Sequence, residues 1–167
     1  MAALAGKRAI GIGVTDAVAL LFVLVVPALS HLTAVPFYLL DPMRLAVLGA
    51  LLASRSRVNG LVLAVALPLL SFGISGHPVF PKCLVIAAEL SVNVLLFWWL
   101  ARVARIGLAA FLSILLSKAF YYGLKALVLG AGLMQMELVS TALWVQLVVA
   151  VAISVCFALW WRNARFR

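Results

Sequence analysis

Charged residues are scarce in this sequence, and acidic residues are the scarcest. Only 10% of the 167 residues are charged, with four Asp and Glu in total, whereas 68% are hydrophobic. A water-soluble globule of this size needs more polar surface than these residues supply. The composition therefore excludes a soluble protein and predicts an all-α integral membrane protein.

Cysteine and histidine are also rare, with two of each. They are scattered along the chain and form no metal-binding motif, so we expect neither a metal nor another cofactor. No histidine lies in an apolar segment where it would serve as a base, and no pair of carboxylates is expected at one membrane depth. These absences argue against an enzyme.

Six apolar segments account for nearly the whole chain. A membrane-spanning helix needs about 20 mostly apolar residues. Polar interruptions divide the sequence into segments of that kind at 9–28, 36–53, 58–75, 84–100, 107–130 and 141–161. The loops between them are too short for a soluble or nucleotide-binding domain, so the sequence predicts a single six-helix transmembrane domain.

The basic residues follow every second apolar segment. Nine of the 13 Lys and Arg residues fall on one side of the membrane in this arrangement: Lys7, Arg8, Arg55, Arg57, Arg102, Arg105, Arg162, Arg165 and Arg167. Short loops rich in Lys and Arg face the cytoplasm. We therefore expect a multi-pass protein of the plasma or inner membrane with both termini in the cytoplasm. The net charge of +9 then reflects topology and not nucleic-acid binding.

Several ionisable residues lie inside the predicted spans, where each charge costs about 2.5–3.5 kcal/mol or more. They are Asp16, Asp41, Arg44, Glu89, Lys118 and Lys125. At about 1.5 Å per residue, Glu89 and Tyr122 lie roughly 12 Å below the outer surface, and Asn93 and Lys118 lie roughly 18 Å below it. Helices four and five thus carry polar side chains at matching depths. The outer half of the bundle therefore contains a candidate polar site.

Two interpretations of this polar level stay open. In one, Glu89 pairs with Lys118 or Lys125 and only fixes two helices together. In the other, three cations exceed what one glutamate neutralises, and the excess binds an anionic or polar solute from outside. The candidate solute contacts are Arg44, His77, Glu89, Asn93, Lys118, Tyr121, Tyr122, Lys125 and Gln146.

Small residues recur at every fourth position of the first segment, at Ala5, Ala9, Gly13 and Ala17. Such a ladder lets another helix approach closely within a membrane. We interpret it as a docking face for another membrane subunit, with packing inside this bundle as the alternative.

Three stretches in the second to fourth segments resemble the substrate-binding S component of energy-coupling-factor transporters, which bind vitamins and related micronutrients. They are DPMRLAVLGA at 41–50, LPLLSFGISGHP at 67–78 and AAEL at 87–90. The small-residue ladder also matches that family's helix-one contact with its transmembrane T component. The resemblance implies that the chain captures a solute outside, and that a T component with paired ATPases drives its delivery. ATP would bind those partners and not this chain.

Two other functions remain alternatives. One is a polytopic scaffold or assembly protein of the cell envelope, which would hold a protein partner but no solute. The other is a membrane-embedded lipid-modifying enzyme, which would need a polar site open sideways to the bilayer.

Overall fold

The chain is all-helical throughout the part that the computed structural model describes, namely residues 12–22, 25, 37–76, 78–133, 137–139 and 141–165. A helix over Ile12–Phe22 comes first. It is followed by a 3₁₀ helix η1 (Phe37–Leu40) and then by α2 (Pro42–Ser54), α3 (Arg57–Ser75), α4 (Phe80–Leu100), α5 (Ile106–Gly130) and α6 (Leu143–Arg165).

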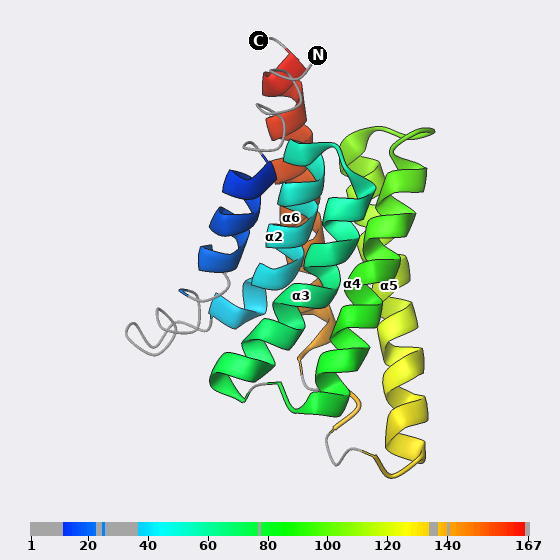
Figure 1. The fold of residues 1–167 in the computed structure, drawn as a ribbon. Helices are drawn as coiled ribbons and strands as arrows, with labels where there is room; N and C mark the ends of the chain where they lie inside the picture. The colour runs from blue at the N-terminus through cyan, green and yellow to red at the C-terminus, as the bar shows by residue number, and fades with distance from the viewer. Residues whose placement is uncertain are drawn as a thin grey trace.

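Helices α2 to α6 run alternately in opposite directions, and each packs against the next along the chain (Figure 1). The α2–α3 corner, the α4–α5 corner and the end of α6 consequently lie at the same end of the bundle. This end carries Arg55, Arg57, Arg102, Arg105 and Arg162. These five arginines therefore share one end of the bundle, which we call the basic end.

Four helices are long and apolar enough to cross a membrane, counted over the described residues: α3, α4, α5 and α6. Half of the apolar window of α4 is buried, against 22–28% for the other three. Helix α4 is therefore central, while the others turn most of their Leu and Val side chains outward, as lipid-facing helices do.

The second predicted segment, 36–53, is not one continuous span. It is divided at Asp41, whose backbone has φ 52° and ψ 59°, so η1 ends there and α2 begins at Pro42. Proline at the first position suits a helix start because its missing N–H has no partner there anyway. At 13 residues α2 is too short to cross a bilayer. It begins part way along the neighbouring α3 and α4 (Figure 1).

Packing around α4 builds the apolar core. Leu48 and Leu51 of α2, Leu67 of α3 and Leu90 and Val94 of α4 are each at most 2% exposed. This core lies between the basic end and the first turn of α2, and so it holds that turn inside the bundle.

Candidate functional site

Arg44 lies at the centre of the polar site, in the first turn of α2, and its side chain is fully buried. Its guanidinium donates three hydrogen bonds to side chains from three different elements. Nε donates to Oδ2 of Asp41 at 2.8 Å and Nη1 to Oγ of Ser117 at 3.0 Å. Nη2 donates to Oε1 of Glu89 on α4. A planar guanidinium suits this task because its donors point in fixed directions.

Lys118 of α5 completes the group. Its Nζ lies 3.3 Å from Oδ2 of Asp41 and 3.2 Å from Oε1 of Glu89. Asp41, Arg44, Glu89 and Lys118 form what we call the charge cluster, in which each cation meets both carboxylates. Two positive and two negative charges cancel.

The expected excess of positive charge is therefore wrong for these residues. Asp41 supplies a second carboxylate beside Glu89, so the expectation that no two carboxylates share a depth is also wrong. The cause is the break at Asp41: because α2 starts inside the bundle, this carboxylate reaches the same cations as Glu89. The pairing of Glu89 with Lys118 is present, but Arg44 shares Glu89 as well.

Within the described part of the chain, the charge cluster is accessible at Asp41 and Lys118. The side chains of Asp41 and Lys118 are each 27% exposed, whereas those of Glu89 and Arg44 are 4% and 0% exposed. A polar molecule would therefore approach the cluster across Asp41 and Lys118.

Asn93 lies one helical turn beyond Glu89 on α4 and is fully buried. Neither its amide nitrogen nor its amide oxygen has a hydrogen-bond partner in the described part of the chain. A buried polar group left without a partner costs roughly 1–3 kcal/mol. Asn93 therefore carries one donor group and one acceptor that no described residue uses.

Lys125 does not join the charge cluster. Its Nζ donates to the backbone carbonyls of Glu137 and Leu138, at 2.6 and 2.8 Å, and so ties the end of α5 to the segment before α6. The ring of Tyr121 lies between the two lysines, with its centroid 5.4 Å from Nζ of Lys118 and 5.8 Å from Nζ of Lys125. This cation–π contact extends the polar level from the cluster toward Lys125.

Tyr122 and Gln146 form a separate pair between α5 and α6. Nε2 of Gln146 donates to the hydroxyl of Tyr122 and also, at 2.8 Å, to the carbonyl of Thr141. The rings of Tyr121 and Tyr122 meet edge to face, with centroids 5.3 Å apart. Of the predicted solute contacts, Arg44, Glu89 and Lys118 thus meet directly, whereas Lys125 and Gln146 have other partners.

Sequence reasoning missed Asp41 and Ser117 as members of this site. The spacing of three between Asp41 and Arg44 was a usable signal, since residues three apart share a helix face. Ser117 gave no such signal, because buried serines commonly bond only to their own helix. Its hydroxyl donates to the carbonyl of Ile114 in its own helix at 3.0 Å, and it also accepts from Arg44 on α2.

The small-residue ladder is described only in its second half. Gly13 and Ala17 are exposed on the Ile12–Phe22 helix, and a Cβ at Gly13 would meet nothing within 4 Å. On the same helix, Oδ1 of Asp16 accepts from Nδ2 of Asn59 on α3 at 2.7 Å. These two small residues therefore do not pack inside the bundle. Ala5, Ala9 and the predicted contact His77 lie outside the described residues.

No protein family matches this chain, and neither a curated protein nor a solved structure matches it.

Proposed function

We propose that this chain is the membrane-embedded solute-binding subunit of an ATP-driven importer of the energy-coupling-factor type. In this proposal the basic end faces the cytoplasm and both termini lie there. The charge cluster lies in the outer half of the bundle and takes up a small vitamin-like solute from outside. The observation that carries the proposal is the unused amide of Asn93, one turn from a buried cluster of four charges.

A purely structural role explains the charge cluster poorly. Burying an ion pair is often no more stabilising than packing apolar side chains of the same volume, and a cluster of four charges multiplies the desolvation cost. A single ion pair would be enough to hold two helices together. Such groups inside a membrane protein generally mark a pathway or a binding site.

The broken second segment supports the same proposal. Irregular backbone at membrane depth is tolerated where protein buries it or where it lines a cavity, and interrupted helices frequently form transporter binding sites. Asp41 holds a left-handed backbone conformation without being glycine, which costs on the order of 1–3 kcal/mol. Strain of this kind persists where the surrounding structure imposes it, and here it brings a carboxylate to the buried arginine.

The neutral charge of the cluster favours a particular class of solute. An anion would have to displace Asp41 or Glu89 from cations that they already neutralise. A zwitterionic or uncharged polar solute avoids that cost, because it can accept from Lys118, donate to Asp41 and exchange hydrogen bonds with Asn93. We therefore propose a polar solute without net charge, in place of the anion that a count of cations first suggested.

The partner proposed is a transmembrane T component with its paired ATPases, docked on the small-residue ladder of the first helix. Exposed Gly13 and Ala17 support this, since a lipid-facing strip of small residues allows close helix approach. ATP hydrolysis takes place in the partners, so the chain itself is not an enzyme in this proposal.

Gentle detergent purification from the native membrane tests the proposal. The purified chain should release one small polar molecule, detected by mass spectrometry, and should bring with it a polytopic subunit and ATPases. A scaffold protein would bring a protein partner but no small molecule. A lipid-modifying enzyme would convert a lipid headgroup. Either of these results would refute the importer proposal.

A further inference from the structure

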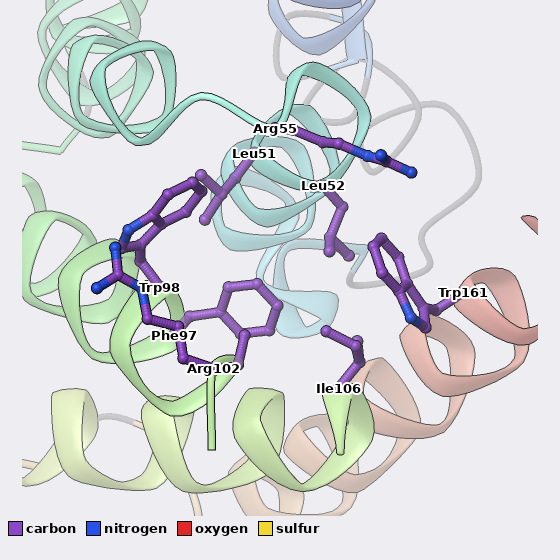
Figure 2. A pocket seen from close by; sticks show the side chains of 9 residues that line it. Leu51, Leu52, Arg55, Phe97, Trp98, Arg102, Ile106 and Trp161 are labelled. Atoms are coloured by element: carbon purple, nitrogen blue, oxygen red, sulfur yellow. The ribbon is translucent and has the colours of Figure 1, made fainter. Parts of the chain in front are cut away.

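A second site lies at the basic end, away from the charge cluster. A cavity of about 240 Å³ opens there where the ends of α2, α4 and α6 meet the start of α5. Its floor is apolar, formed by Leu51, Leu52, Phe97 and Ile106 (Figure 2). The charge cluster sits in the first turn of α2, whereas this cavity lies at its last turn, so the two sites are separate.

Two arginine–tryptophan pairs flank the cavity on opposite sides (Figure 2). The guanidinium carbon of Arg55 lies 5.5 Å from the ring centroid of Trp161, and that of Arg102 lies 5.6 Å from the ring centroid of Trp98. Both arginines are exposed. Each cation is thus held over an aromatic face while its charge stays available at the rim.

The described acidic residues do not neutralise this rim. Asp41 and Glu89 belong to the charge cluster, Asp16 bonds to Asn59, and Glu137 lies beside Lys125 in the segment before α6. Trp98 is one of the residues that line the cavity. Its indole Nε1 is buried and has no acceptor in the described part of the chain. The rim therefore presents two positive charges, which suit an anion with oxygen acceptors.

The dimensions and lining decide what kind of molecule fits. Pockets for small solutes usually measure about 300–1,000 Å³ and bring several polar groups together on the ligand. This cavity is smaller, and its polar groups stand on opposite sides with apolar side chains between them. An amphiphile satisfies both features, with its anionic head at the arginines and a hydrocarbon segment on Leu51, Leu52 and Phe97.

We propose that this cavity binds an anionic phospholipid from the membrane leaflet at the basic end. The phosphate lies at Arg55 and Arg102, and the upper part of one acyl chain fills the apolar floor. Basic pockets between transmembrane helices recognise anionic headgroups in this way, and tryptophans favour the headgroup level. This site is independent of the solute-binding proposal.

Native mass spectrometry of the full chain tests the proposal. The protein, stripped of lipid in detergent, is titrated with phosphatidylglycerol and with phosphatidylcholine carrying identical acyl chains. Phosphatidylglycerol should bind more tightly. The double variant R55Q/R102Q should weaken that binding by about 30-fold, because each arginine near an anionic surface contributes roughly a factor of five.

Two further variants separate the cavity from general surface charge. The double variant R57Q/R105Q removes the same charge from the same end, but neither residue lines the cavity, so it should retain binding within about threefold. Ala101→Leu keeps every charge but places a larger side chain in the lining. It should weaken phosphatidylglycerol binding while the protein keeps its melting temperature.

Three results would overturn the proposal. Equal binding of the two lipids would show that the cavity does not distinguish an anionic headgroup from a zwitterionic one. Equal losses in R57Q/R105Q and R55Q/R102Q would assign binding to diffuse surface charge. Dimers that dissociate in R55Q/R102Q, with unchanged lipid binding, would show that a second copy of the chain occupies the cavity.

Discussion

Replacing Glu89 by glutamine should destabilise the protein markedly, because it removes one charge from a buried pair and leaves the other. The side chains of Glu89 and Arg44 are 4% and 0% exposed. Removing one partner of a buried ion pair typically costs about 3–5 kcal/mol. Arg44 keeps its bonds to Asp41 and Ser117, and glutamine keeps an oxygen that accepts from Arg44. We therefore expect a loss near the lower limit, about 3 kcal/mol.

The assay is equilibrium unfolding in mixed micelles, with the double variant Arg44→Met/Glu89→Leu as the matched control. That variant removes both partners and fills their space with apolar side chains, so it should be less destabilised than Glu89→Gln. It also leaves Asp41 and Lys118 as a remaining pair. The reasoning fails if Glu89→Gln unfolds with the wild-type free energy. It also fails if the double variant loses as much free energy of unfolding as Arg44→Met and Glu89→Leu lose together when each is made alone.

Two other predictions concern helix packing and the unused amide. Gly107→Ala should lower the free energy of unfolding by about 1–3 kcal/mol, since its Cβ would lie 2.9 Å from that of Ala158 on α6. In Gly123→Ala on the same helix, the added Cβ meets nothing within 4 Å, so the free energy of unfolding should change by no more than about 1 kcal/mol. If both variants lose the same free energy of unfolding in micelles, this account of α5–α6 packing is contradicted. Asn93→Leu should raise the free energy of unfolding by roughly 1–3 kcal/mol, because it removes a buried amide without a partner. A loss of stability in that variant would mean that Asn93 bonds within the protein.

The sequence predicted the long helices well, because apolar length alone sets them. Helices α3 to α6 lie close to the predicted segments 58–75, 84–100, 107–130 and 141–161. The alternation of basic residues also predicted which helix ends share one face. The break in the second segment was harder to place, because Pro42 permits either a helix start or a kink. The conformation of Asp41 that decides between them depends on packing.

The charge cluster was predicted in part. Counting residues from the helix ends placed Glu89, Lys118 and Arg44 in the same polar region of the bundle. Such counting gives depth but not rotation about the helix axis, nor the position of loop carbonyls. Lys125 therefore looked like a fourth member, whereas its charge is satisfied by the backbone of Glu137 and Leu138.

The central claim is that a solute binds at the charge cluster, and the occupancy of the released small molecule tests it most directly. Wild-type protein, Lys118→Ala and Lys82→Ala are purified side by side, and the molecule released per mole of folded protein is measured by mass spectrometry. Lys82 is the control because it is a cation of α4 outside the cluster. The account predicts a molecule retained by wild type and Lys82→Ala and lost from Lys118→Ala. Equal retention by all three proteins, or no bound molecule in wild type, would contradict it.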